Sequence, residues 1–463
     1  MKIRFYGAVR TVTGSLHIVE TARGDTLLVD CGMFQGRRAE ARERNMTLPI
    51  PPSGVKAIVL THAHIDHTGN LPTWAAKGLR CPIYATGATA DLTGLMLRDS
   101  AHIQVSDATH VNKNLRRGEA AVQPLYTPEH AEAAIALVRG RNYREWFDVL
   151  PGVRATFQDA GHILGSASIT LEETVNGSKQ SLSFTGDVGR PDSPILKDPE
   201  PFAEGAGAVV SECTYGDRDH PPQAELPEEL RKILYRTIAR GGKLIIPAFA
   251  VGRTQVLLYA LRGLQRAGKL PEVPVYVDSP LATGATELFA RHPECYDAAA
   301  LSVSREDGAL FAVEGYVATR STEESKALNE KKGPFIVISA SGMCEAGRIL
   351  HHLDHGLGDP RNTILIVGFQ AENTLGRRLV EHQPKVRVFG QERDVKAEVA
   401  VLEGFSAHAG RSELAAYLER CRPRGPLFLV HGEESRALAF KTFLEGRGFP
   451  DVRVATEGNE WKV

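Results

Sequence analysis

The sequence predicts a mixed α/β protein with two kinds of region, a sandwich of β-sheets covered by helices and a parallel sheet flanked by helices. Three observations support this fold class: short β-branched runs closed by glycine in the first two hundred residues, a strand-turn-helix pattern that repeats after residue 221, and an ordinary soluble composition. The chain has 463 residues, of which 42% are hydrophobic and 24% are charged, so two or three domains are expected.

The first region contains runs that are typical of the strands of a sheet sandwich. They include L-L-V-D-C-G, which ends at Gly32, A-I-V-L-T-H, which ends at His62, and S-L-S-F-T-G-D, which ends at Asp187. Helix-like stretches lie between them, near residues 88–102 and 128–139. This region is therefore expected to combine helices with sheets.

The second region starts near Pro221 and repeats one unit, in which an apolar strand leads through a glycine-containing turn into an amphipathic helix. The three units begin at Lys243, Pro334 and Thr363. Strands followed directly by helices indicate a parallel sheet with helices packed against it. The last seventy residues return to short strands, each followed by a helix.

Charge and cysteine content exclude several classes of protein. The 55 basic and 56 acidic side chains give a net charge of -1, so any anionic substrate must be bound locally and not by bulk attraction. No apolar run approaches the roughly 18 residues of a membrane span, and we expect a cytoplasmic protein without membrane contact. The six cysteines are scattered and form no C-x-x-C pair, which argues against disulfides and against a thiolate zinc site. Any metal must then be held by histidines and carboxylates.

One segment, T-H-A-H-I-D-H-T-G, places four ligand-type side chains directly after an apolar strand. They are His62, His64, Asp66 and His67. At a strand end, alternate imidazoles can point to one side and Asp66 with His67 to the other, which suits two adjacent cations. Imidazole and carboxylate together favour zinc, with manganese and iron as alternatives. A chance histidine-rich surface turn is the competing interpretation.

This segment resembles the signature of the metallo-β-lactamase superfamily, and the chain supplies the other residues that the resemblance requires. His162 in D-A-G-H-I-L-G and Asp187 in F-T-G-D-V-G-R match the distal histidine and the bridging aspartate of the superfamily. Asp30 in L-L-V-D-C-G matches the early aspartate that orients a ligand histidine. The resemblance implies an αββα sandwich with two Zn²⁺ per chain. The implied ligands are, for one ion, His62, His64 and His162, for the other, Asp66 and His67, with Asp187 as the bridge.

Three further motifs resemble those of the β-CASP nucleases, the branch that contains the endonuclease of eukaryotic pre-mRNA 3′-end cleavage. Glu212 lies in V-V-S-E-C-T-Y-G, His408 in G-F-S-A-H-A-G and His431 in F-L-V-H-G-E. The similarity covers essentially the whole chain. Because the third motif is a histidine in RNA-directed members and commonly an apolar residue in DNA-directed ones, His431 favours RNA.

The β-CASP resemblance also implies how the chain is divided. The metallo-β-lactamase domain would comprise residues 1–212 and 396–463, and the β-CASP domain, built on the parallel sheet flanked by helices, would be inserted at residues 213–395. The active site is expected in the cleft between the two domains.

The residues of the three further motifs supply acid–base chemistry. Cleavage of a phosphodiester expels a poor alkoxide, which a positioned histidine can protonate. We assign this role to His408, with Glu212 bonded to its other ring nitrogen to fix the tautomer and favour the protonated form. His431 would complete the ligands of the second metal, and Asp66 would orient the attacking water.

Small residues and an arginine at the turns of the second region suggest contacts to RNA phosphates. The candidates are Arg253, Ser341, Gly342, Arg348, Thr374 and Arg377. Unpaired N–H groups at a helix N-terminus can bind phosphate when glycines allow close approach. In the competing interpretation the glycines serve only tight turns, and Ser341 and Thr374 are helix caps.

Two other sets of residues are expected to have structural roles. His351, His352 and His355 lie in a predicted helix without an acidic partner cluster, and we expect them to be solvated or packed. Phe249 and Phe369 follow their strands, and we expect burial, with stacking on bases as the alternative.

The motifs together predict a zinc-dependent ribonuclease of single-stranded RNA, mainly an endonuclease, with 5′-to-3′ exonuclease action as an open alternative. The rival interpretations are a DNA-directed nuclease, a catalytically silent RNA-binding scaffold, and a hydrolase of small esters, thioesters or lactams. The last leaves Glu212 and His408 without a role, and the intact ligand set argues against a silent scaffold. A homodimer is left open.

Overall fold

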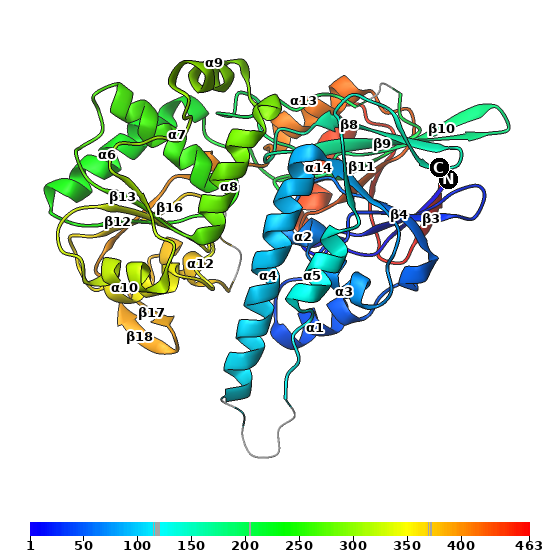
Figure 1. Ribbon diagram of the computed structural model, residues 1–463. Helices are drawn as coiled ribbons and strands as arrows, with labels where there is room; N and C mark the ends of the chain where they lie inside the picture. Colours follow the sequence, from blue (N-terminus) through cyan, green and yellow to red (C-terminus); the bar gives the residue numbers. More distant parts are fainter. Residues whose placement is uncertain (114, 116–120, 203–204, 369, 371–372) are drawn as a thin grey trace. The chain divides into compact units, whose positions relative to one another are not determined.

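The chain divides into two compact units, which Figure 1 shows in the computed structural model. The first unit comprises Met1–Pro191, Asp198–Asp219 and His408–Val463, and the second comprises Asp192–Lys197 and His220–Ala407. The structure describes residues 1–113, 115, 121–202, 205–368, 370 and 373–463. The domain limits inferred from the resemblance stay predictions.

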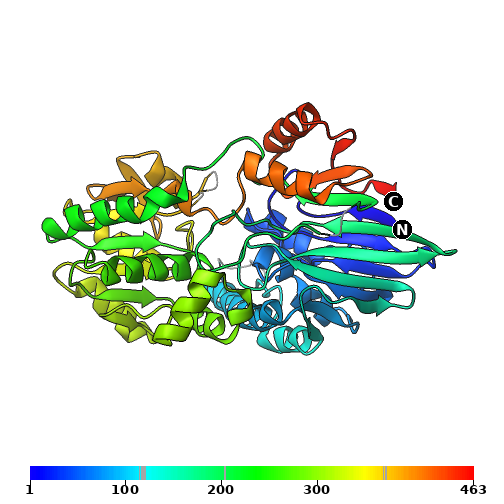
Figure 2. The same ribbon diagram turned by 90° about the horizontal axis from the view of Figure 1, so that it is seen from above.

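The first unit is built on two seven-stranded sheets that pack face to face. One sheet has the order β22-β1-β2-β3-β4-β5-β6, with β1 Lys2–Phe5, β2 His17–Glu20, β3 Thr26–Val29, β4 Val55–Val59, β5 Ile83–Thr86, β6 Val138–Arg141 and β22 Glu460–Lys462. The other has the order β21-β20-β11-β10-β9-β8-β7, with β7 Phe147–Leu150, β8 Val153–Asp159, β9 Ala167–Val175, β10 Ser178–Phe184, β11 Ala208–Glu212, β20 Leu427–Val430 and β21 Val452–Val454. Apolar side chains of both sheets, such as Val59 and Phe157, form the core between them. Figure 2 shows the strands of the second sheet (teal) in front of those of the first (blue).

Helices cover the outer faces of both sheets, which completes the predicted αββα sandwich (Figure 1). The bounds are α1 Arg38–Met46, α2 Ile65–Thr68, α3 Leu71–Ala76, α4 Gly87–Lys113 and α5 Pro128–Ile135 beside the first sheet, and α13 Arg411–Cys421 and α14 Glu434–Gly446 beside the second, with the 3₁₀ turn η1 Pro52–Gly54. Trp74 and Leu97 pack on the first sheet, and Leu418 and Phe440 pack on the second. Amphipathic helices therefore bury the sheet faces that point away from the central core.

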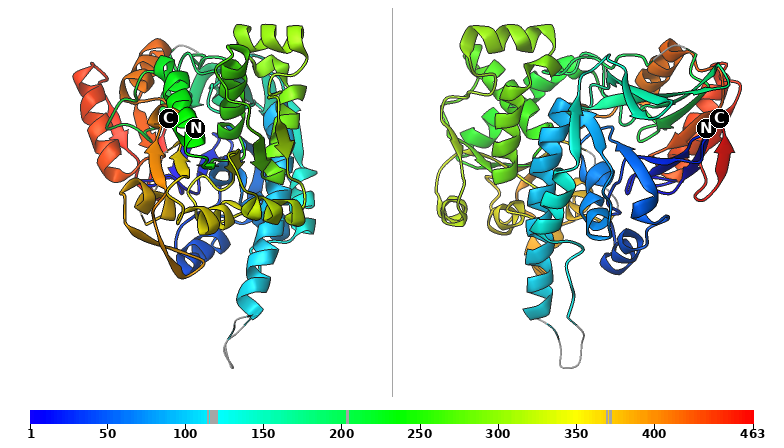
Figure 3. Two further views of the ribbon diagram at one scale, coloured as in Figure 1. Left: turned by 90° about the vertical axis from the view of Figure 1, so that its left-hand side faces the viewer. Right: turned by 45° about the vertical axis from the view of Figure 1, so that its right-hand side comes forward.

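The helix α4 is longer than the sequence pattern predicts. It continues to Lys113, and Figure 3 shows its second half extending away from the sheets. Residues 103–113 contain neither glycine nor proline, so no helix-breaking residue ends the helix earlier. α5 instead ends at Ile135, because residues 138–141 pair with β5 as strand β6.

The second unit contains a six-stranded parallel sheet with the order β14-β13-β15-β12-β16-β19. The strands are β12 Leu244–Pro247, β13 Val275–Asp278, β14 Tyr316–Ala318, β15 Ile336–Ser339, β16 Thr363–Ile366 and β19 Glu398–Val401, and a hairpin is formed by β17 Lys385–Val388 and β18 Gln391–Asp394. The helices are α6 Leu226–Ala239, α7 Arg253–Arg266, α8 Pro280–Arg291, α9 Ala298–Asp307, α10 Thr322–Glu330, α11 Ile349–Gly356 and α12 Leu375–Val380, with 3₁₀ turns η2 Gln223–Glu225, η3 Pro293–Cys295 and η4 Glu403–Phe405. Figure 1 shows α6 and α7 on one side of this sheet and α10 and α12 on the other.

The fold class predicted from the sequence is confirmed, because the apolar runs of the second region become strands buried on both faces. The four residues of β12, β13, β15 and β16 are all buried, as parallel sheets covered by helices require. No helix in the described part of the chain is long and apolar enough to cross a membrane.

Candidate metal centre

Polar side chains of the first unit gather where several strands end at the same edge. In the second sheet, β10 pairs parallel to β11 and β11 parallel to β20, while β8 and β10 are both antiparallel to β9. The carboxyl ends of these four strands therefore lie at one edge of the sheet. Glu212 ends β11, and His162, Asp187 and His431 follow β8, β10 and β20.

The H-x-H-x-D-H segment reaches the same place from the first sheet. His62 and His64 follow β4, and Asp66 and His67 lie in the short helix α2. Asp30 follows β3, which runs parallel to β4. Side chains that are far apart in the sequence thus meet because parallel strands of two facing sheets end together.

The structure brings the predicted ligands into two groups, in each of which the ligand-type atoms lie within 4.8 Å of one another. The first group is His62, His64, His162 and Asp187, and the second is Asp66, His67 and His431. The resemblance stated above assigns the same residues to the two ions.

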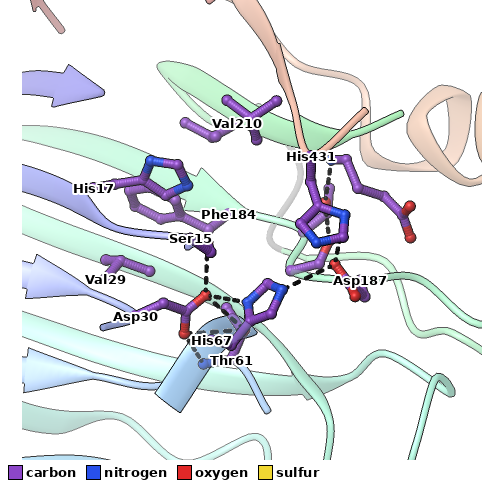
Figure 4. A pocket seen from close by; sticks show the side chains of 14 residues that line it. Ser15, His17, Val29, Asp30, Thr61, His67, Phe184, Asp187, Val210 and His431 are labelled. Atoms are coloured by element: carbon purple, nitrogen blue, oxygen red, sulfur yellow. Dashed lines mark hydrogen bonds and ion pairs between the residues drawn. The ribbon is translucent and has the colours of Figure 1, made fainter. Parts of the chain in front are cut away.

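Asp187 lies between these two groups and presents one oxygen to each. Its Oδ2 is 3.5 Å from His62 Nε2 and 3.6 Å from His162 Nε2. Its Oδ1 is 3.5 Å from His67 Nε2 and 3.6 Å from His431 Nδ1. Figure 4 shows Asp187 connected to both His67 and His431. This is the placement expected of a carboxylate that bridges two cations.

The chemistry of this centre fits zinc. Imidazole and carboxylate donors about 2.0–2.2 Å from one tetrahedral ion lie roughly 3.3–3.6 Å apart, which matches the distances around Asp187. In the described part of the chain, His67 Nε2 and Asp187 Oδ1 are buried and have no hydrogen-bond partner. Buried polar atoms are normally paired, so two that face each other without a hydrogen bond indicate a group that binds both.

The pKa values also indicate an excess of negative charge. Burial alone would lower the pKa of His67, but the nearby Asp187 and Asp30 carboxylates raise it to about 10. Burial lowers the pKa of His64 to about 4, which leaves its imidazole in the neutral form that binds metals. The centre therefore offers neutral imidazoles on one side and a surplus of carboxylate charge on the other.

Asp30 holds the ring of His67 in a fixed orientation. His67 Nδ1 donates to Asp30 Oδ2 over 2.7 Å, because an ionised carboxylate can only accept. The backbone N–H of Thr61 donates to Asp30 Oδ1 over 2.8 Å, and the Thr61 hydroxyl lies 2.9 Å from Oδ2. The Nε2 atom of His67 consequently faces Asp187, as expected for a ligand histidine oriented by a carboxylate.

His408 and Glu212 form a pair beside the two groups. His408 Nδ1 lies 3.1 Å from Glu212 Oε2, and the backbone N–H of Val188 donates to Glu212 Oε1 over 2.6 Å. Burial alone would lower the pKa of His408, but the charge of Glu212 and its hydrogen bond raise it to about 9. These contacts favour the protonated form of the imidazole, with Nδ1 held by the carboxylate.

The loop after Asp187 is tied to the segment that carries His408. The backbone N–H of Ala409 donates to the carbonyl of Val188 over 2.8 Å. The buried Arg190 Nη2 lies 3.1 Å from Glu413 Oε1, and Glu413 also accepts the N–H of Gly410 over 2.7 Å. This ion pair fixes the two segments relative to each other.

Comparison with known protein families shows to which family this chain belongs. Family models match the metallo-β-lactamase superfamily over residues 11–211, the Beta-Casp domain over residues 254–379 and the Zn-dependent metallo-hydrolase RNA specificity domain over residues 392–455. Ribonuclease TTHA0252 of Thermus thermophilus is 39% identical over 450 residues, which cover 97% of this chain and 97% of that protein. The chain belongs to the β-CASP ribonucleases of the metallo-β-lactamase superfamily. It is an enzyme of the metallo-hydrolase class.

Two archaeal relatives extend the β-CASP similarity over nearly the whole chain. The RNase J-like protein of Methanocaldococcus jannaschii is 30% identical over 95% of this chain and 94% of its own length. Transcription termination factor FttA of Methanosarcina mazei is 31% identical over 94% of this chain and 67% of its own length.

The predicted phosphate contacts lie in the second unit, which carries the Beta-Casp match. They follow β12, β15 and β16, which are neighbours in the parallel sheet, so they share one sheet edge. Arg348 Nη1 donates to the buried Asp278 over 2.8 Å, and its Nη2 donates to the carbonyl of Arg320 over 3.2 Å. These contacts favour a structural role for Arg348.

The remaining candidates have local partners that are typical of turns and caps. Thr374 Oγ1 accepts the N–H of Arg377 and caps α12, and Arg377 Nε donates to Glu381 over 2.7 Å. Ser341 and Gly342 do not begin a helix, because α11 starts only at Ile349. The Ser341 hydroxyl instead accepts the N–H of Glu345 over 3.3 Å and closes a turn. Arg253 is the first residue of α7.

Sequence reasoning missed the residues that position the site from a distance. Thr61, Arg190 and Glu413 belong to this class. The ion pair joins residues that are 223 positions apart in the chain, and nothing in the sequence around either residue indicates it. For Thr61, the signal was its place directly before His62.

Proposed function

We propose that this β-CASP enzyme is a zinc-dependent ribonuclease that hydrolyses the phosphodiester bonds of single-stranded RNA, mainly by internal cutting. The observation that carries the proposal is the position of Asp187, which offers one oxygen to each histidine group and lies beside the His408–Glu212 pair. RNA is supported by the match to an RNA specificity domain and by relatives named as ribonucleases.

The ligand groups imply which residues would hold which ion. The proposed ligands are, for one ion, His62, His64 and His162, for the other, Asp66, His67 and His431, and for both, Asp187. When bound, the cations supply Lewis-acid chemistry that polarises the scissile phosphate and lowers the pKa of water. We assign to Asp66, whose Oδ2 lies 3.3 Å from His431 Nε2, the orientation of the attacking water.

His408 is the proposed general acid. Because Glu212 holds Nδ1, the proton for the leaving alkoxide comes from Nε2. A positioned acid of this kind contributes about 10²–10⁴-fold to the rate. Glu212 acts by orienting the ring and stabilising its charged form, so Glu212→Gln is expected to lower kcat more than it changes KM.

A cleavage assay tests this proposal directly. Metal-loaded protein is incubated with an end-labelled single-stranded RNA and with its DNA counterpart, beside a chelated sample and the His408→Ala variant. We expect internal RNA fragments that disappear with chelator and form about 10²–10⁴-fold more slowly in the variant. The exposed His355→Ala serves as the matched control and should cut at the wild-type rate.

Each alternative function predicts a different pattern of cleavage products in this assay. A ladder of mononucleotides would replace internal cutting with exonuclease action from the 5′ end, and equal cutting of DNA would place the enzyme among the DNA-directed nucleases. If RNA is retained but neither polymer is cut, the protein is a silent scaffold and the proposal fails. His431→Val tests the basis for RNA, since the preference for RNA over DNA should weaken. The cytoplasmic location and the homodimer stay predictions from the sequence.

A further inference from the structure

Phe249 presents its ring to solvent at the carboxyl edge of the parallel sheet in the second unit. It follows β12, and its side chain is 42% exposed. The expectation that this residue is buried is therefore wrong. Phe369, for which the same expectation was made, lies outside the described residues.

The backbone around Phe249 holds it firmly. Its carbonyl accepts the hydroxyl of Thr254 over 2.8 Å and the N–H of the same residue over 3.3 Å. One step earlier, the N–H of Ala248 donates to the carbonyl of Ser339 in β15 over 3.0 Å. The ring is thus attached to a rigid strand end and does not lie on a long loop.

Gly342 lies against the ring and fixes how it is presented. A Cβ atom at this position would come within 2.9 Å of Phe249 Cδ2 and 3.0 Å of Cε2. Only glycine allows so close an approach, because Cβ contacts this short do not occur without a shift of one partner. The ring therefore rests on the Gly342 backbone, and its exposed part points away from that backbone.

The surroundings of the ring are not those of a protein-docking patch. The other exposed large apolar side chains in the described part of this unit are Tyr235 in α6, Val317 in β14 and Phe389 after β17. None of them lies in the described loops that follow β12, β15 and β16. Protein interfaces need a contiguous apolar patch, whereas a single flat ring on a polar edge suits a single flat base.

The topology places this ring where α/β sheets bind ligands. β12 lies between β15 and β16. The chain leaves β12 towards β13, past β15, and leaves β15 towards β16, past β12, so these two neighbouring strands connect in opposite directions along the sheet. In open parallel sheets the crevice at the carboxyl ends beside such a reversal is the usual ligand position.

We propose that Phe249 is a stacking platform for one base of the single-stranded RNA. This inference rests on the proposed function and adds a base-contacting residue to it. Stacking on an aromatic ring tolerates every base, because each has a flat π-face, so Phe249 contributes affinity without sequence preference.

Binding of a short single-stranded RNA measures the contribution of the ring. In the His408→Ala background, which slows cleavage, Phe249→Ala should raise Kd by at least about fivefold, while Phe249→Trp should keep or lower it. The matched control is Tyr235→Ala, since Tyr235 is also 42% exposed in the same unit and should leave Kd unchanged. An unchanged Kd in Phe249→Ala would overturn the proposal, and the exposed ring would then be a candidate contact for a protein partner.

A second measurement separates stacking from electrostatic binding. Phe249→Trp adds an indole to the three native tryptophans, and its fluorescence should be quenched by a base-bearing strand beyond the wild-type signal. An abasic strand with the same number of phosphates should cause no added quenching, and equal quenching by both strands would refute stacking. If wild-type protein neither binds nor cuts RNA, the proposed function fails. If the wild-type protein binds and cuts RNA and the Phe249 variants bind RNA equally well, the proposed function stands and this inference alone fails.

Discussion

Two buried aspartates, one in each unit, show what distinguishes a candidate metal centre from a structural cluster. Asp187 follows β10 in the first unit, and Asp278 ends β13 in the second. Both side chains are almost completely buried, and both meet histidines from distant parts of the chain. They differ in the number of hydrogen bonds that their carboxylate oxygens accept.

Every direction around the Asp278 carboxylate is occupied by a donor. Its Oδ1 accepts from Arg348 Nη1 over 2.8 Å and from the Thr319 hydroxyl. Its Oδ2 accepts from Ser325 Oγ and from His352 Nε2, each over 2.6 Å. A carboxylate with four donors has no lone pair left for a ligand, so this cluster stabilises the fold.

The contacts from the surrounding histidines to the Asp187 carboxylate are longer instead, at 3.5–4.0 Å. Its Oδ1 has no hydrogen-bond partner in the described part of the chain, and His67 Nε2 and His431 Nδ1 lie 3.5 and 3.6 Å from it. The difference teaches that burial and charge alone do not mark a functional site. At Asp187 the distinguishing observation is a buried oxygen that has no hydrogen-bond partner in the described part of the chain and faces His67 and His431.

The largest expected difference between the two aspartates is in metal binding. Asp187→Asn removes the bridging charge, so bound zinc per chain should fall and RNA cleavage should drop below detection. Asp278→Asn should keep the wild-type zinc content, because none of its partners is a proposed ligand. Metal analysis after dialysis against zinc checks both variants. A full zinc content in Asp187→Asn would remove the basis for the bridge.

For the stability of the fold we expect the reverse, with a larger loss in Asp278→Asn than in Asp187→Asn. Asp278→Asn leaves the half-buried Arg348 charge without its counter-charge and should lower the free energy of unfolding of the second unit by about 2–3 kcal/mol. In chelated protein, Asp187→Asn should cost no more than about 1 kcal/mol, because Oδ1 has no hydrogen bond to lose. Denaturant unfolding of the two variants measures this contrast. Equal losses would show that Asp187 is also a structural residue.

The Asp278 cluster also makes a prediction for acid pH. Burial alone would raise the pKa of Asp278, but hydrogen bonds from His352 and Ser325 hold it well below its usual range. A pKa lowered on folding gives stability that is present above the unfolded value of about 4 and is lost as pH falls towards the folded value. The stability gap between wild type and Asp278→Asn should therefore be constant from pH 7 to about 5 and shrink by up to about 1.4 kcal/mol per pH unit below 4. A gap that widens in acid would contradict this assignment.

The smallest expected effect concerns the ion pair that positions His408. Arg190→Gln should lower kcat for RNA by about tenfold with little change in KM, because the acid is displaced while the ligands stay in place. Arg190→Lys keeps the charge and should recover part of the rate. Kinetics of the two variants beside wild type, with zinc content as a control, test this role. A loss confined to KM would assign Arg190 to substrate binding instead.

The sequence alone was sufficient to predict those features that depend on residues close together in the chain or on a complete motif. The ligands from His62 to His67 lie within six consecutive residues, so their spacing already indicates a centre for two adjacent ions. The strand-turn-helix repeat predicted the parallel sheet, because buried parallel strands are continuous apolar runs. Glu212 and His408 were paired only through a resemblance, since 196 residues separate them.

The sequence failed where a side chain acquires its partner from elsewhere. His352 was expected to lack an acidic partner, but it bonds to Asp278, which lies 74 positions earlier. Phe249 was expected to be buried because it follows an apolar strand, but it is 42% exposed, with Gly342 against its ring. The phosphate contact of Arg348 stays a prediction, but its ion pair with Asp278, 70 positions earlier, has no signal in the sequence.

The sequence by itself determined the fold class, the donor types of the centre and the residues that could hold a metal, because these depend on hydrophobic periodicity and on the chemistry of single side chains. The tertiary structure decided which oxygen of Asp187 faces which histidine group, which aspartate is saturated, and which aromatic ring reaches solvent. These properties depend on where strands that are distant in the chain end relative to one another. That is set by sheet pairing and close packing, which no local pattern of residues specifies.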